Sequence, residues 1–244
     1  YVDWIVDNFS VESCVAIDGY LVSLEQGRML AEKLKVAHMS FRTDIDPVSN
    51  VWKDRPGMPG GVVFEHSLEY TGRSRKEKIT LIRSEMKKTG AQWHFVSSLD
   101  DIAWILNLRG NDIAYNPVFL SYLLLGESSV VLMVDKEKIP HSLFEALEKN
   151  GVEIKPYDSV PDVLAKLPAK TALLYDPRRT SYALSEVLDA GIKRVEAINP
   201  SILFKSRKTP VEIAHIRRTM LEDGAAFCEF QAWFDTETAD GGNG

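Results

Sequence analysis

The chain has 244 residues, 45% of them hydrophobic, which is enough apolar material for one large domain or two ordinary ones. A net charge of −6, from 29 basic and 35 acidic residues spread evenly, argues against nucleic acid or an anionic membrane surface as a partner. The longest apolar runs, 118–125 and 130–134, are too short to cross a membrane, so we expect a soluble protein.

The first 45 residues predict a helix at 2–9, a strand at 14–17, a helix at 25–34 and a strand at 38–42. Prolines and glycines then crowd the segment from Asp46 to Gly72, where neither a helix nor a central strand is expected. We interpret this segment as a linker, with a domain boundary near Tyr70.

An α/β layered domain is predicted after this boundary, because helix and strand patterns alternate. A helix at 74–89 ends at Gly90, and the apolar runs 119–125 and 130–134 read as two buried strands joined in a hairpin. The other expected strands are 93–96, 152–156, 171–175 and 194–197, and the other expected helices are 100–106, 143–148, 160–167 and 181–188.

A long helix is predicted from Thr209, since Thr209, Pro210 and Glu212 supply an N-cap, a first-turn proline and a capping-box carboxylate. Apolar side chains recur along it at near-helical spacing, so one stripe should face a large partner surface. From 236 to 244 the sequence turns to Thr, Ala, Asp, Gly and Asn, and we expect the helix pattern to stop there inside a longer protein.

Two cysteines, Cys14 and Cys228, lie at opposite ends of the sequence. This usage favours small buried apolar side chains over a disulfide framework or a thiolate metal site. We therefore expect both to be buried, in a reducing, cytoplasmic protein.

No catalytic or metal-ligating set is visible in the sequence. The five histidines are scattered without ligand spacing, and there is no P-loop, nucleophile elbow or His-Glu-x-x-His motif. The pairs Asp7 with Asp18 and Asp101 with Asp112 each enclose ten residues, but chance spacing and helix capping by Asp101 explain them better than metal binding. We expect no catalytic residue, no metal ligand and no cofactor within this chain.

The segment from Leu99 to Phe119 is the strongest candidate for a ligand contact. A short helix leads into a polar loop carrying Asn107, Arg109 and Asn116, ahead of a buried strand. Polar loops at the end of a sheet often carry function in α/β folds, so these three are predicted to bind substrate. The alternative is turn chemistry with a surface pair between Arg109 and Asp112.

Several stretches resemble, in order, the Xaa-Pro aminopeptidases, the three-domain members of the creatinase and aminopeptidase P superfamily. They are Val-Trp-Lys-Asp-Arg-Pro at 51–56, Leu-Glu-Tyr-Thr-Gly at 68–72, the 99–119 segment, Lys-Ser-Arg-Lys-Thr at 205–209, Glu-Ile-Ala-His-Ile-Arg-Arg at 212–218 and Asp-Gly-Ala-Ala at 223–226. The resemblance covers the chain from Tyr1 to about Phe234.

The resemblance implies a chain with three parts. Residues 1–69 would be the back part of the first creatinase N-terminal-like domain with its linker, 70–203 the second such α/β domain, with a mixed sheet and flanking helices, and 204–244 the start of a pita-bread catalytic domain. Two divalent metal ions, typically manganese, would be bound beyond Gly244, in an enzyme that hydrolyses the N-terminal bond of peptides with proline second. A homodimer is expected.

On this interpretation the chain supplies substrate-cleft walls and subunit contacts, and the chain alone is inactive. The rival hypothesis is a non-enzymatic peptide-binding module of creatinase-like fold.

Overall fold

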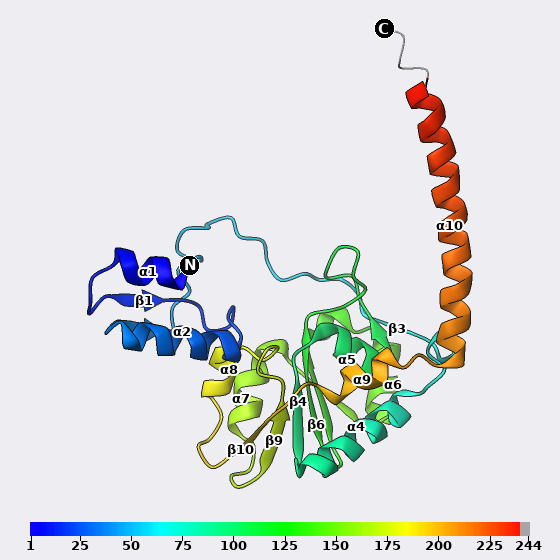
Figure 1. The fold of residues 1–244 in the computed structure, drawn as a ribbon. Helices are drawn as coiled ribbons and strands as arrows, with labels where there is room; N and C mark the ends of the chain where they lie inside the picture. The colour runs from blue at the N-terminus through cyan, green and yellow to red at the C-terminus, as the bar shows by residue number, and fades with distance from the viewer. Residues whose placement is uncertain (240–244) are drawn as a thin grey trace.

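A mixed six-stranded sheet forms the centre of the computed structural model, which describes residues 1–239 of the chain (Figure 1). Its strand order is β10-β9-β4-β6-β7-β8, and β6 alone runs antiparallel to the other five. The strands are β4 (Trp93–Val96), β6 (Ser121–Gly126), β7 (Val130–Val134), β8 (Val152–Lys155), β9 (Ala172–Tyr175) and β10 (Lys193–Glu196). The predicted α/β class and the β6–β7 hairpin are confirmed.

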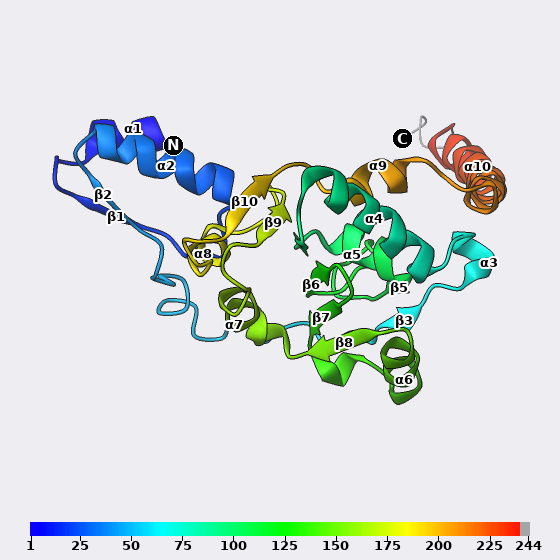
Figure 2. The same ribbon diagram turned by 90° about the horizontal axis from the view of Figure 1, so that it is seen from below.

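Successive residues of a strand point to opposite faces of the sheet. Both faces of this sheet carry apolar side chains, and helices cover both. Leu123 and Leu125 of β6 belong to one core cluster, whereas Leu124 between them belongs to the other. Figure 2 shows the sheet between helices on its two sides. The first cluster is covered by α4 (Arg75–Thr89), α5 (Leu99–Leu106), α6 (His141–Lys149) and α9 (Pro200–Ser206), and the second by α7 (Val160–Ala165) and α8 (Tyr182–Glu186).

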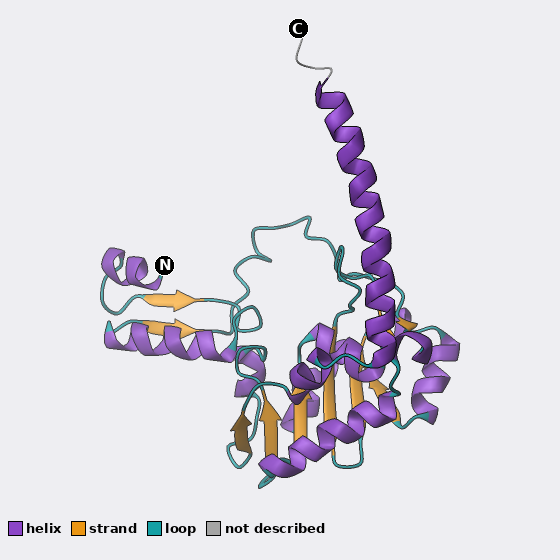
Figure 3. Cartoon of the chain, turned by 45° about the vertical axis from the view of Figure 1, so that its right-hand side comes forward, coloured by secondary structure: helices purple, strands orange, loops and turns teal. Residues whose placement is uncertain are grey.

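The first residues form a smaller unit beside this sheet (Figures 1 and 3). It consists of α1 (Val2–Asn8), β1 (Cys14–Ala16), α2 (Leu24–Val36) and β2 (Ser40–Arg42), as predicted, with β1 and β2 paired in parallel. Its core is small, with Val2, Val22 and Leu30 buried.

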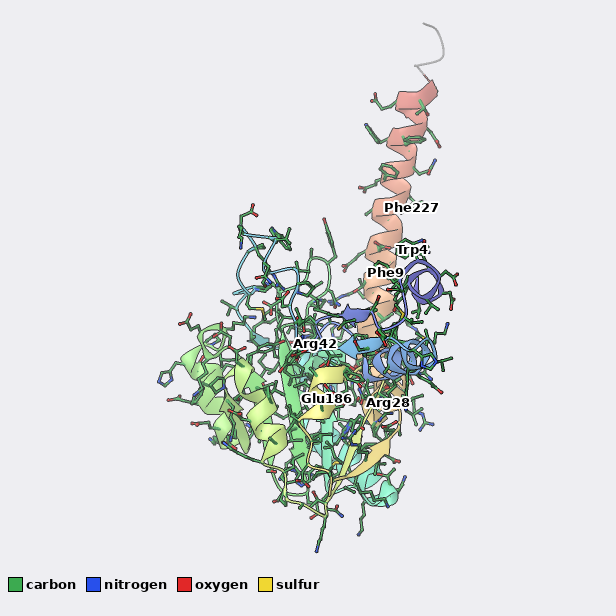
Figure 4. All side chains as sticks on the ribbon, turned by 90° about the vertical axis from the view of Figure 1, so that its left-hand side faces the viewer. Trp4, Phe9, Arg28, Arg42, Glu186 and Phe227 are labelled. Atoms are coloured by element: carbon green, nitrogen blue, oxygen red, sulfur yellow. The ribbon has the colours of Figure 1, made fainter. Side chains whose placement is uncertain are left out.

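The smaller unit is joined to the sheet domain through the start of α2. The backbone N–H of Leu24 donates to Thr180 O at 2.8 Å, and that of Tyr182 donates to Val22 O at 2.9 Å. Arg28 makes a bidentate ion pair with Glu196 of β10, at 2.7 and 2.8 Å. Figure 4 shows Arg28 and Glu186 near this junction.

The linker contains more regular structure than the sequence predicts. Inside the 46–72 segment lie β3 (Phe64–Glu65), α3 (Leu68–Thr71) and the fully buried Val63. β3 pairs with β5 (Leu108–Arg109), a two-residue strand that was also not predicted. The expectation of an irregular segment up to Gly72 is therefore wrong, because contacts with residues more than 40 positions away order its last part.

The predicted terminal helix is confirmed as α10 (Pro210–Ala239), with its capping box of Thr209 and Glu212 at 2.7 and 3.2 Å. Within the described residues it runs on to Ala239, past the expected stop at 236, and none of its residues is buried. Residues 240–244 of the proposed third part lie outside the described chain. Helix α9 was not predicted.

The prediction that both cysteines are buried is wrong. Cys14 is exposed on β1, in a sheet of only two strands, and Cys228 is exposed on α10. Along β1 the residues alternate, so that Val15 is partly covered while Cys14 and Ala16 are exposed, and no residue of α10 is buried.

Candidate site at the end of helix α5

Three basic side chains converge on the C-terminal end of α5. The last carbonyls of a helix have no partner within it, and cations are favoured there by the helix dipole. The donor and acceptor pairs are Arg75 Nε to Leu106 O at 3.0 Å, Lys78 Nζ to Trp104 O at 3.0 Å and Arg109 Nη1 to Ala103 O at 3.2 Å. Their hydrogen bonds hold positive charge at one point beside the polar loop.

Asn107 is buried at the centre of this arrangement, with 4% of its surface exposed. It ends α5 in the left-handed conformation, with φ 53°, which asparagine tolerates better than most residues. Its Oδ1 accepts from Lys78 Nζ at 2.5 Å, and its Nδ2 donates to Arg73 O at 2.9 Å. Both ends of its amide are therefore engaged within the protein.

Lys78 is the most buried basic side chain here, at 1% exposure. Its ammonium lies 4.4 Å from the centre of the Trp104 ring, a cation–π contact. Burial lowers the pKa of Lys78 to about 8.

Arg109 is half-buried, and its Nη1 donates to Leu108 O at 2.8 Å as well as to Ala103 O. Burial lowers the pKa of Arg109, while the charge of Glu212 at the start of α10 raises it. Guanidinium stays protonated at neutral pH even so. The Nε and Nη2 groups donate no hydrogen bond to any residue of the described chain, so they are available to a ligand.

The alternative pairing of Arg109 with Asp112 is wrong. Asp112 instead accepts from Lys138 Nζ at 2.6 Å and from Leu120 N at 2.6 Å, and both charged side chains are buried, at 0% and 2% exposure. Lys138 lies 26 positions away, which is why the local sequence pointed to Arg109.

Asn116 lies apart from the other two predicted residues, in the exposed tip of the loop. Its backbone N–H donates to Ile113 O at 3.1 Å, closing a turn. No hydrogen bond in the described chain joins its side chain to Asn107 or Arg109. The structure thus brings Asn107 and Arg109 together and leaves Asn116 at the rim.

The first turns of α10 are attached next to this cluster. His215 Nε2 donates to Glu69 O at 3.1 Å, and the Tyr70 ring lies between His66, at 5.4 Å, and His215, at 4.9 Å. Burial, followed by the nearby charges of Arg109 and Lys78, lowers the pKa of His66. These contacts fix where α10 leaves the sheet domain.

The local sequence around the loop does not indicate the roles of Arg75 and Lys78. Both fall on the same helical stripe as the buried Ile79, Ile82 and Met86, at spacings of three and four residues. Basic residues on an otherwise apolar stripe were the signal that could have identified them, because a buried charge requires a partner.

The donor set can hold a carbonyl or a carboxylate, but it offers no nucleophile. Over residues 1–239, no group of three or more histidine, cysteine, aspartate or glutamate side chains lies close enough to hold a metal ion. Asp101, for which the sequence favours a capping role, instead accepts from Lys205 Nζ at 2.9 Å and Asn199 Nδ2 at 3.2 Å. In the same range, no helix combines the length and hydropathy needed to cross a membrane.

Comparison with known proteins identifies the fold. Residues 54–212 match the family model described as the creatinase/prolidase N-terminal domain. The chain belongs to this family. The resemblance to Xaa-Pro aminopeptidases is confirmed by relatives that align over 96% of the chain, a probable Xaa-Pro aminopeptidase P of Leptosphaeria maculans at 34% identity and Xaa-Pro aminopeptidase 1 of Dictyostelium discoideum at 35%.

A solved structure has the same fold over nearly the whole of this chain. It is an X-prolyl aminopeptidase from Caenorhabditis elegans, described as a cytosolic enzyme with a di-nuclear active site, with a TM-score of 0.90 and 26% identity over 98% of this chain. The chain spans only 40% of that protein, and 40% and 39% of the two relatives.

Proposed function

We propose that this chain is the non-catalytic N-terminal portion of an Xaa-Pro aminopeptidase, which removes the first residue from peptides with proline second. The observation that carries the proposal is the alignment of 96% of the chain with relatives of that name at 34% and 35% identity. The chain accounts for about two fifths of their length. In such an enzyme, the remaining three fifths would carry the catalytic residues.

The exposed face of α10 supports this proposal. Its apolar side chains remain open to solvent in the described chain, including Phe227 at 64%, Phe230 at 53% and Phe234 at 45%. Exposed apolar surface of this extent marks an interaction site. We assign this face to contact with a catalytic domain that begins with α10, following the proposed parts 1–69, 70–203 and 204–244.

Two divalent metal ions, which we propose to be manganese, would be bound outside this chain. The carboxylates and histidines of residues 1–239 do not fit such a site, because no three of them gather at one point. We further propose a cytoplasmic homodimer, with peptides as substrates and with cleft walls and subunit contacts as the contribution of this chain.

Within that enzyme we propose that the end of α5 faces the substrate. Arg109 would contact a peptide carbonyl or carboxylate through its available donors, and Asn116 would contact it from the loop tip. Asn107 would act as a positioning residue, since Lys78 and Arg73 engage its amide.

The test is to purify the native gene product and measure release of the first residue from an Ala-Pro-Phe peptide, with and without added Mn²⁺. The proposal predicts metal-dependent release that stops when a chelator is added. A gene product that ends near Gly244, binds the peptide and releases nothing would establish the non-enzymatic module instead.

A further inference from the structure

Three tyrosines from separate parts of the chain line one cavity of about 310 Å³. Tyr20 lies in the loop between β1 and α2, Tyr122 lies on β6, and Tyr157 lies in the 3₁₀ helix η2 (Tyr157–Ser159). The other lining residues are Asp158, Val160 and Pro161. A cavity of this volume falls at the lower end of the range that holds small ligands. None of the residues that line this cavity belongs to the site at the end of α5.

The tyrosine rings are held in place by their neighbours. The rings of Tyr122 and Tyr157 lie 5.1 Å apart at 32°, and their hydroxyls are 3.5 Å apart. Phe95 stacks against Tyr122 at 5.7 Å from within the core. Two of the three rings are thus fixed before any ligand arrives, which lowers the entropic cost of binding.

The electrostatics of the cavity favour a positive ligand. Among the six lining residues, Asp158 is the one that carries a formal charge, and no basic nitrogen of residues 1–239 lies within 4.0 Å of its carboxylate. A second carboxylate, Asp18, accepts from the backbone N–H of Tyr20 at 2.8 Å. Burial and the charge of Asp18 raise the pKa of Tyr20, so its phenol stays neutral and its ring face keeps its attraction for cations.

We propose that this cavity binds an organic cation, an alkylated ammonium or a guanidinium group, between the faces of Tyr20, Tyr122 and Tyr157 and beside Asp158. Ring faces attract cations through their quadrupole, and a carboxylate at the edge supplies the counter-charge. An anion would meet the negative ring faces and the carboxylate of Asp158.

A second cavity, of about 350 Å³, adjoins the first and shares Tyr157 and Asp158 with it. It lies where the loops after β7 and β8 meet, at the carboxyl ends of these parallel strands. Its lining carries charges of both signs, from Asp135 and Glu137 and from Lys136 and Lys138, and the Lys138 ammonium is paired with Asp112. This edge of an α/β sheet is where ligands usually bind. It offers room for the remainder of a molecule whose cationic group occupies the tyrosine cavity.

Calorimetric titration of the purified chain with choline tests the proposal, at constant ionic strength. Its neutral carbon analogue, 3,3-dimethylbutanol, is the matched ligand. We expect choline to bind at least tenfold more tightly than the analogue, because only the cation gains from the rings and from Asp158. A blocked lysine dipeptide is the third ligand. Tighter binding than choline identifies a peptide side chain as the natural source, and weaker binding identifies a small alkylated cation.

Three variants at two positions, Tyr157 and Asp158, complete the experiment. Tyr157→Leu removes a ring face and should weaken choline binding by about tenfold, whereas Tyr157→Phe keeps the face and should bind like the parent. Asp158→Asn should also weaken binding, and because Asp158 is exposed this change leaves the core intact. Equal binding of choline and its analogue, no binding of either, or unchanged choline binding by Tyr157→Leu would overturn the proposal.

Discussion

Lys138 and Asp112 form an ion pair at 2.6 Å with both side chains almost completely buried. Lys138 follows β7 in the 3₁₀ helix η1 (Lys136–Lys138), whereas Asp112 belongs to the polar loop after α5. The pair therefore ties the loop that carries Arg109 and Asn116 to the central sheet. The Val63 N–H donates to Lys138 O at 2.9 Å, so the end of the linker is attached at the same point.

Removing one partner of this pair should be costly. Asp112→Ala leaves the Lys138 ammonium buried without a counter-charge, and we expect a loss of about 3–5 kcal/mol in the free energy of unfolding. The double variant Asp112→Leu with Lys138→Met should lose much less. Urea denaturation measures both, with Lys88→Ala, which breaks an exposed pair with Glu85, as a control expected to cost about 0–1 kcal/mol. Equal losses in the single and double variants would show that the charges are not coupled.

The buried Lys78 should make stability depend on pH. Its pKa is lowered to about 8 in the folded state, so the unfolded chain, near 10.5, holds the proton more tightly. Its contribution to stability is therefore fully present above about pH 10.5 and is lost as the pH falls through 8. Denaturation midpoints between pH 7 and 10 should rise less in Lys78→Met than in the parent. Lys76→Met, on the exposed face of the same helix, is the matched control and should follow the parent curve.

The apolar stripe of α10 should cause the isolated chain to associate. Phe227, Phe230 and Phe234 are all about half exposed or more, and burial of such surface is favourable. Analytical ultracentrifugation should show self-association that the triple change of these phenylalanines to serine abolishes. The same number of changes to serine or alanine on the opposite face, at Glu222, Glu229 and Thr236, should leave it unchanged. A parent chain that is monomeric at all concentrations would contradict this.

A conservative substitution separates the structural role of Arg109 from its proposed role in binding substrate. Arg109→Lys keeps the positive charge and a donor for the α5 carbonyls but lacks the guanidinium fork. In the intact enzyme we expect kcat/KM to fall by about tenfold, or about 1.4 kcal/mol, with little change in Tm. Arg109→Ala should lower both. If Arg109→Lys is fully active, Arg109 only caps the C-terminal end of α5 and does not bind substrate.

Local patterns predicted the regular elements well, because hydrophobic periodicity and capping residues act over a few positions. Helix α4 begins after Ser74 and ends at Gly90, where φ is 71°, as its sequence indicates. Long-range contacts account for what was missed. Helix α9 is only seven residues long, and it is secured by Lys205 and Asn199, which both bond to Asp101 of α5 about a hundred positions earlier.

In the candidate site, too, local patterns identified residues and long-range contacts were missed. Asn107 and Arg109 were identified from their local loop, but the buried partners that hold this region, Lys78 and Lys138, come from other elements. A single sequence does not show which of several lysines pairs with a given carbonyl or carboxylate. The burial of Cys14 was misjudged for a related reason, since it depends on whether a neighbouring layer covers β1.

The most direct test of the proposed function is a peptidase assay on residues 1–244 alone, beside the native gene product at equal molar concentration, both with added Mn²⁺. The substrate is the Ala-Pro-Phe peptide, and the readout is free alanine by mass spectrometry. If the chain is a non-catalytic portion of an Xaa-Pro aminopeptidase, the gene product releases alanine and the chain alone releases none. Metal-dependent release by the chain alone, lost on Asp101→Ala or Asp112→Ala at a pH where both variants remain folded, would contradict the account.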